Sequence, residues 1–118
     1  MSDIAFRGSM SFGGFRSMWV MVLFDLPTDS QDARRDYRVF REMLLESGFI
    51  MLQFSVYTRH CSTEEKADAL SGRVLGGLPE DGQVRVFTMT DKQFERMKVY
   101  VGKIKRKNEA APEQLSFF

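Results

Sequence analysis

Cysteine and long apolar runs are scarce in this sequence. Cys61 is the single cysteine, so no disulfide can form within the chain, which is typical of proteins from a reducing cytoplasm. The apolar run from Trp19 to Phe24 is far shorter than the roughly 20 residues of a membrane-spanning helix. There is also no phosphate-binding loop, dinucleotide fingerprint, Ser-His-Asp set or zinc-protease motif, which argues against the enzyme classes that depend on them.

An excess of charge of one sign is lacking too. Lys and Arg total 17 and Asp and Glu total 16, so the net charge of +1 neither favours nor disfavours a nucleic-acid partner. The 43% of hydrophobic residues and 28% of charged residues are typical of a soluble globular domain. We predict a flexible leader over 1–17, a folded domain over 18–101, and a basic linker with a C-terminal interaction tail over 102–118.

The apolar residues follow the periods of strands and helices in turn. Trp19 to Phe24 does not alternate, which predicts a strand buried on both faces. The spacing of Thr28 and Gln31 predicts a capping box, followed by a helix that ends near Ser47 at Gly48. The buried stripe expected of that helix is Ala33, Tyr37, Phe40 and Leu44.

The second half of the domain repeats this alternation of strand and helix. The strand-like stretch 49–60 is either one bent strand or two strands joined by a tight turn. Ser62 and Glu65 have capping-box spacing and predict a second helix to Leu75. A strand over 84–89, a short helix over 91–97 and a short strand over 99–101 follow. We therefore predict an α+β fold, a ferredoxin-like βαββαβ sandwich with an extra short C-terminal strand.

The unalternating first strand has a consequence for assembly. Two helices cover only one face of such a sheet, so the other face needs a different cover. The simplest cover in a chain of this length is a second copy, packed sheet against sheet in a homodimer. The alternative is that the leader or the tail folds back over that face.

Asp25 is the first candidate for chemistry. It directly follows the buried run, where a half-desolvated carboxylate is costly unless it is paired or binds a metal. In a symmetric dimer two copies of Asp25 would approach each other and hold one Mg²⁺ against a phosphate. Alternatively, Asp25 only caps the turn that follows it.

Positive charge gathers in two places. One is a helical stripe whose guanidinium groups suit the phosphates of a DNA duplex or of RNA; its members are Arg34, Arg35, Arg38 and Arg41. The other is the segment 92–107, with seven positive residues against Glu95. Alternatively, the stripe is a solvated helix face paired with nearby acids, and the segment is a solubilising linker.

Two further features are weaker. His60 and Cys61 are adjacent, so their side chains point apart on a strand, and one imidazole with one thiol makes no zinc site in one protomer. The apolar C-terminus predicts a short strand that adds to a partner, with Leu115, Phe117 and Phe118 as the partner-binding residues.

The ordered set of motifs resembles a known family. The stretch from Trp19 to Pro27, then Arg34-Arg35, then Gly48-Phe49 before the segment 53–57, and later the segment 84–94, is similar to the small CRISPR-associated endoribonuclease family, the Cas-two subunit of spacer acquisition. With Leu26-Pro27 and Arg59 to Cys61, the pattern resembles the branch of Cas-nine-type (type II) systems. The resemblance covers about residues 18 to 101.

The resemblance implies a fold, an activity and partners. It implies a ferredoxin-like homodimer that bridges dimers of the Cas-one integrase and holds duplex DNA for insertion into the CRISPR array. It also implies Mg²⁺-dependent cleavage of single-stranded RNA, with Asp25 as catalytic residue and metal ligand. Supporting positions would be Phe24, Ser55 and Tyr57. Many members carry Arg where this chain has Met51, which weakens the nuclease expectation.

Two alternatives to the nuclease remain open at this point. The first is a non-catalytic scaffold that binds DNA and sets the distance between two integrase active sites. The second, outside the family, is an RNA-binding sheet of the RRM type, which is disfavoured because the aromatic-rich motif of that fold is missing.

Overall fold

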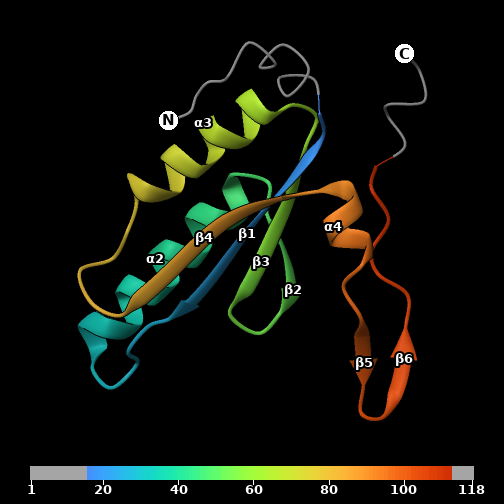
Figure 1. Cartoon of the computed structure of the whole chain (residues 1–118). Helices are drawn as coiled ribbons and strands as arrows, with labels where there is room; N and C mark the ends of the chain where they lie inside the picture. The colour runs from blue at the N-terminus through green and yellow to red at the C-terminus, as the bar shows by residue number, and fades with distance from the viewer. Residues whose placement is uncertain (1–15, 113–118) are drawn as a thin grey trace.

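The computed structural model describes residues 16–112, and these form one sheet, three helices and a projecting hairpin (Figure 1). The expected order of elements is confirmed, and the stretch 49–60 is two strands. The elements are β1 (Met18–Asp25), α2 (Gln31–Glu46), β2 (Ile50–Gln53), β3 (Val56–Cys61), α3 (Glu64–Leu75), β4 (Gln83–Thr90), α4 (Asp91–Glu95), β5 (Val99–Val101) and β6 (Ile104–Arg106).

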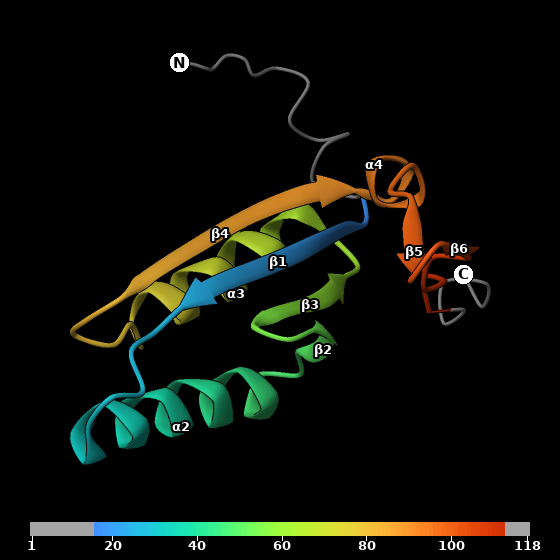
Figure 2. The same cartoon turned by 90° about the horizontal axis from the view of Figure 1, so that it is seen from below.

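The main sheet has the strand order β2-β3-β1-β4, with β1 antiparallel to both of its neighbours. Figure 2 shows the four strands side by side. Together with the order of the helices, this is the ferredoxin-like βαββαβ topology that the sequence predicts. No helix in the range 16–112 has the length and apolar character needed to cross a membrane.

The helix boundaries differ slightly from the predicted ones. Ser30, rather than Thr28, caps α2, and its hydroxyl accepts a hydrogen bond from the Ala33 N–H. Likewise Thr63, rather than Ser62, caps α3. Both predicted residues are ordinary capping types, so spacing alone could not choose between neighbours. Gly48 follows α2 with φ +89°, the left-handed conformation that favours glycine after a helix.

The first face of the sheet packs against α2 and α3. Val20, Val22 and Phe24 of β1 are buried there. Phe40 and Leu44 of α2 are buried against them, as the predicted stripe requires. The helix α3 contributes Ala67, Leu70 and Val74, the three residues predicted to face inward. The larger of the two hydrophobic cores therefore lies between the sheet and the two long helices.

The second face is covered over only half of its length. Trp19 stacks on Phe94 of α4 at 3.9 Å between ring centroids, and Met97 and Ala111 pack beside them. Toward the Asp25 end, the cover stops, and Phe87 is 43% exposed. The chain's own C-terminal segment thus folds over part of this face, and the remaining part is open in a single copy.

The segment that follows α4 is more structured than the sequence indicates. After Gly102, where a basic linker is predicted, β6 pairs antiparallel with β5. The resulting hairpin extends away from the main sheet (Figure 1), with Tyr100, Val101 and Ile104 more than half exposed. The predicted partner-binding residues Leu115, Phe117 and Phe118 and most of the predicted leader lie outside the described residues.

Gly82, in the loop before β4, is the glycine whose replacement should cost most. Its φ is +95°, and a Cβ there would lie 2.7 Å from the carbonyl oxygen of Asp25. We expect Gly82→Ala to lower the free energy of unfolding by about 1–3 kcal/mol. Gly72 in α3 is the matched control, since an added Cβ meets nothing within 4 Å, and Gly72→Ala should stabilise by about 0.5–1 kcal/mol. Urea unfolding measures both, and equal effects would contradict this expectation.

Candidate functional site

Asp25 is the last residue of β1 and lies on the open half of the second face. Its partner in the register of β4 is Gln83, and Leu23 shares its face. The carboxylate is exposed rather than desolvated, and the adjoining Phe24 side chain is buried toward the helices. Because side chains alternate along β1, Phe24 is buried on one face of the sheet while Asp25 is accessible on the other.

A cavity of about 300 Å³ surrounds the end of β1. Its walls come from the ends of β1 and β4 and from the turn between β2 and β3. Leu23, Phe24, Asp25, Phe54, Ser55, Val56, Gln83 and Arg85 line it. The family resemblance groups Asp25 with Ser55, and in the fold both residues line this cavity.

The turn that carries Ser55 has an uncommon backbone conformation. Ser55 has φ +62°, which non-glycine residues rarely adopt. The Phe24 N–H donates a hydrogen bond to the Ser55 carbonyl oxygen at 3.1 Å, which ties the turn to β1 beside Asp25. Phe54 of the same turn is 79% exposed. The turn thus presents an apolar ring and a hydroxyl at the rim of the cavity.

Arg85 is a member of this site that sequence reasoning missed. It pairs with Leu23 across the β1–β4 ladder, two residues from Gln83 and on the same face. Its side chain makes one long hydrogen bond, 3.5 Å to Gln83 Oε1, and within 16–112 no carboxylate pairs with it. The signal in the sequence is an arginine between two valines, Val84 and Val86, which are both half-buried. Because side chains alternate along a strand, Arg85 lies on the opposite face from these valines, which is the face of Asp25.

Phe24 and Tyr57, the other predicted supporting residues, face the helices instead. Their rings stack with centroids 5.6 Å apart. The Tyr57 hydroxyl accepts a hydrogen bond from Arg41 Nε at 2.8 Å. Phe24 still lines part of the cavity wall, whereas Tyr57 does not line the cavity.

The predicted arginine stripe does not form one uniform surface. Arg41 is half-buried through its bond to Tyr57, while Arg38 is exposed. Arg34 donates from Nη1 to the Thr28 carbonyl oxygen at 3.2 Å. Arg35 forms an ion pair with Asp32 at 3.0 Å on the exposed surface. For this residue, the structure agrees with the alternative interpretation, a solvated helix face paired with nearby acids. Of the four arginines in the stripe, Arg34 and Arg38 are therefore the most accessible to a ligand.

His60 and Cys61 point apart, as predicted. His60 Nε2 lies 3.3 Å from Asp91 Oδ1, and its ring meets Trp19 edge-on. Cys61 faces α3 on the other side of the sheet, where burial raises the pKa of its thiol while the charges of Arg59 and Lys66 oppose that rise. Among the described residues, no group of three His, Cys, Asp or Glu side chains can hold a metal ion.

The site therefore offers a single carboxylate per chain, and its donors are all oxygens. Asp25 supplies a carboxylate, Ser55 a hydroxyl and Gln83 an amide oxygen. Oxygen donors suit Mg²⁺ or Ca²⁺ rather than zinc. With Arg85 beside them, these groups can bind a phosphate that shares its negative charge between a cation and a guanidinium group.

Comparisons with known proteins place the chain in a family. Residues 18–97 match the family described as "CRISPR associated protein Cas2". A protein of Parvibaculum lavamentivorans named "CRISPR-associated endoribonuclease Cas2" is 50% identical over 101 residues, covering 86% of this chain and all of that protein. A protein of the same name from Flavobacterium psychrophilum is 40% identical, covering 88% of this chain and 90% of its own length.

A solved structure titled "Crystal structure of cas2" is 20% identical with a TM-score of 0.46, and the match covers 81% of this chain and 99% of that one. The family does not depend on this likeness, because the sequence matches span nearly the whole folded part of the chain. The chain belongs to the Cas2 family of CRISPR-associated proteins.

Proposed function

We propose that this chain is a metal-dependent endoribonuclease that cleaves phosphodiester bonds of single-stranded RNA at the cavity of Asp25. The observation that carries the proposal is that an exposed carboxylate, Asp25, and an arginine, Arg85, line one open cavity, and that no carboxylate within 16–112 pairs with this arginine. A phosphodiester needs both: a cation site for one oxygen and a positive group for the developing charge. The names of the relatives from Parvibaculum and Flavobacterium agree with this activity.

Mg²⁺ is the metal that the donors fit best. It is commonly held by one or two carboxylates together with waters and a substrate phosphate, and the cavity supplies only oxygen donors. Asp25 would hold the ion, which when bound supplies a water of lowered pKa and neutralises phosphate charge. The chain's own residues bind and orient the RNA: Arg85 pairs with the phosphate, and exposed Phe54 offers a ring on which a base stacks.

The functional unit would be a homodimer. One copy leaves the Asp25 end of the second face uncovered, with Phe87 and Ile50 about half exposed. Sheet-to-sheet packing of two copies about a two-fold axis would bury these residues and bring two Asp25 carboxylates toward one shared site. The second carboxylate would then complete the ligand set that a single chain lacks.

In adaptation, the same dimer would bridge two dimers of the Cas-one integrase and hold duplex DNA for insertion into the CRISPR array. Arg34 and Arg38 are exposed on α2 and suit contacts to the DNA backbone. This role requires no bond to be broken by this chain. It therefore stays separable from the cleavage at Asp25.

Metal removal tests the cleavage directly. We expect the purified chain to cut a labelled single-stranded RNA in the presence of Mg²⁺ and to stop when EDTA is added, because the phosphate charge is then left without its cation. Restoring Mg²⁺ should restore the activity. Undiminished cleavage in EDTA would contradict a metal at Asp25, and no cleavage under any metal would leave only the scaffold role.

Removal of the Arg85 guanidinium group should slow the same reaction. We expect Arg85→Ala to reduce kcat/KM by about 10- to 100-fold, because one charged hydrogen bond to the phosphate is lost. Arg85→Lys should recover part of this loss. Arg96→Ala is the control, since Arg96 is exposed at the C-terminal end of α4 and does not line the cavity. If both alanine variants cleave at the wild-type rate, Arg85 does not contact the substrate.

A further inference from the structure

A second cavity, of about 520 Å³, lies between α3 and β3, on the helix side of the sheet and thus opposite Asp25. Among the residues that the structure describes, three basic side chains and no acidic one line its walls. Arg59, Lys66 and Arg73 are the basic residues, and Cys61, Ser62 and Leu70 lie between them. A cavity with this charge is a potential anion site.

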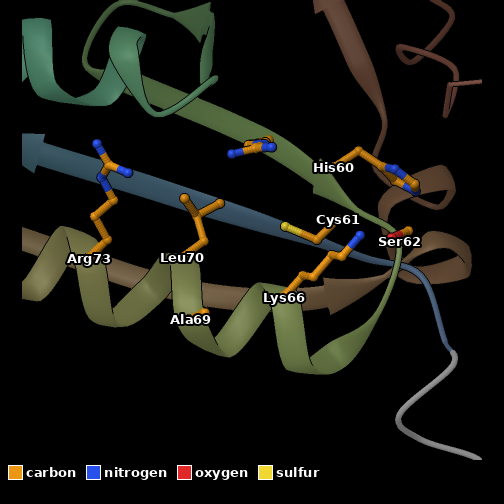
Figure 3. A pocket seen from close by; sticks show the side chains of 8 residues that line it. His60, Cys61, Ser62, Lys66, Ala69, Leu70 and Arg73 are labelled. Atoms are coloured by element: carbon orange, nitrogen blue, oxygen red, sulfur yellow. The ribbon is translucent and has the colours of Figure 1, made fainter.

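The basic side chains converge because of where they sit on their elements. Lys66, Leu70 and Arg73 occupy positions i, i+4 and i+7 of α3, which places them on one face of the helix. Figure 3 shows all three side chains pointing toward the strand that carries Cys61, whereas His60 points away. Arg59 and Cys61 alternate with His60 along β3 and therefore share the face that looks toward α3.

The charges in this cavity are largely unused within the fold. Arg59 donates from Nη1 to the Ser47 carbonyl oxygen at the end of α2, a helix whose last turn has no basic residue of its own. A guanidinium group carries further N–H donors beyond the one used here. Within 16–112, neither Lys66 nor Arg73 pairs with a carboxylate, and both are exposed. The charges of Arg59 and Lys66 also act on the Cys61 thiol, whose pKa they lower against the effect of burial.

Positive charge continues beyond the cavity along the same strand. Tyr57, two residues before Arg59 on β3, holds the guanidinium group of Arg41 from α2. The cations are therefore spread along β3 between the two helices rather than gathered around one point. A spread of this kind fits the repeated phosphates of a polymer better than a single free anion.

We propose that the cavity between α3 and β3 binds backbone phosphates of a nucleic-acid strand, through Lys66 and Arg73 with Arg59 behind them. This site shares no residue with the cavity of Asp25 and lies on the other face of the sheet. It binds without cleaving, so it extends the nucleic-acid surface of the protein to the cavity between α3 and β3. It stands whether or not the chain is a nuclease.

The test compares two double variants with the same change of charge. We expect Lys66→Gln/Arg73→Gln to weaken binding of a fluorescein-labelled single-stranded oligonucleotide by about tenfold and to reduce the salt dependence of log K by about 1.4, since two contacts are lost. Lys92→Gln/Arg96→Gln, in α4 and at its C-terminal cap, is the control and should lose less than the first pair. Equal losses in the two double variants would overturn the site.

A second measurement locates the ligand and separates a strand from free phosphate. Cys61 is the single thiol of the chain and lines the cavity; because it is buried, its alkylation by iodoacetamide is slow, and the rate is followed over hours under mildly alkaline conditions as a report on what is bound there. We expect the oligonucleotide to slow alkylation at micromolar concentration, and inorganic phosphate to do so only at millimolar concentration. No protection by the oligonucleotide, or equal protection by inorganic phosphate at the same concentration, would overturn the proposal. This measurement uses the wild-type chain and does not depend on the folding of a variant.

Discussion

Asp25→Asn should abolish Mg²⁺-dependent RNA cleavage, with a loss of at least ~100-fold in kcat, because the variant keeps the shape of the side chain but not the charge that would hold the proposed metal. The thermal midpoint should be nearly unchanged, since the Asp25 side chain is exposed and makes no ion pair within 16–112. Capture of duplex DNA should also persist. A cleavage assay beside a thermal unfolding curve measures both effects.

Asp68→Asn is the matched control for this experiment. Asp68 is an exposed carboxylate on α3, on the helix side of the sheet, so its neutralisation changes the net charge equally without touching the cavity of Asp25. We expect its cleavage rate to equal that of the wild type. If Asp25→Asn retained full activity with Mg²⁺, the site would have to lie elsewhere. If it lost DNA capture while folded, the separation of scaffold from nuclease would be wrong.

Duplex binding should respond to a different set of residues. We expect the combined change of Arg34, Arg35 and Arg38 to alanine to weaken binding of a DNA duplex and to lower the slope of log K against log salt by about 2 to 3 for each protomer engaged, since each lost phosphate contact accounts for about 0.9. Arg35 should contribute least, because its ion pair with Asp32 already engages it. Anisotropy measured from low to moderate salt gives this slope.

The control triple variant removes the same charge from the β5–β6 region. Lys103, Lys105 and Lys107 are exposed there and can be replaced together by alanine. If only this second variant weakened DNA binding, the DNA would contact the β5–β6 hairpin rather than α2. An unchanged salt slope in the arginine variant would show that the stripe on α2 does not contact the DNA. RNA cleavage should be unaffected by either variant.

Much of the fold could be predicted because local signals agreed with one another. The stripe of α2 and the inward residues of α3 follow helical spacing, and the Thr90–Gln93 capping box of α4 is present as its spacing indicates. The β2–β3 break could not be predicted, because the turn uses Ser55 at φ +62° where a glycine or asparagine signal is usual. The pairing of β6 with β5 was hidden in a segment that looks basic and polar.

The site could be predicted only in part, and for a geometric reason. Asp25 stands out locally because it ends a buried run, but Arg85 joins the same cavity from a strand some 60 residues later, through a register that no spacing reveals. Phe24 and Tyr57 were grouped with Asp25 by resemblance, whereas the alternation of β1 and β3 turns their rings toward the helices. The sequence predicts a cover for the second face; the structure supplies one over half of that face, and a cover by a second copy stays a prediction. The sequence could not show that α4 supplies half of it.

Subunit mixing tests most directly the claim that two Asp25 carboxylates form one site. Wild-type and Asp25→Asn chains would be unfolded, mixed in known ratios and refolded, and RNA cleavage would be measured at constant total protein. If each site needs both carboxylates, activity follows the square of the wild-type fraction, so an equal mixture keeps about one quarter of the wild-type rate. Activity that falls in simple proportion to the wild-type fraction would contradict the shared site.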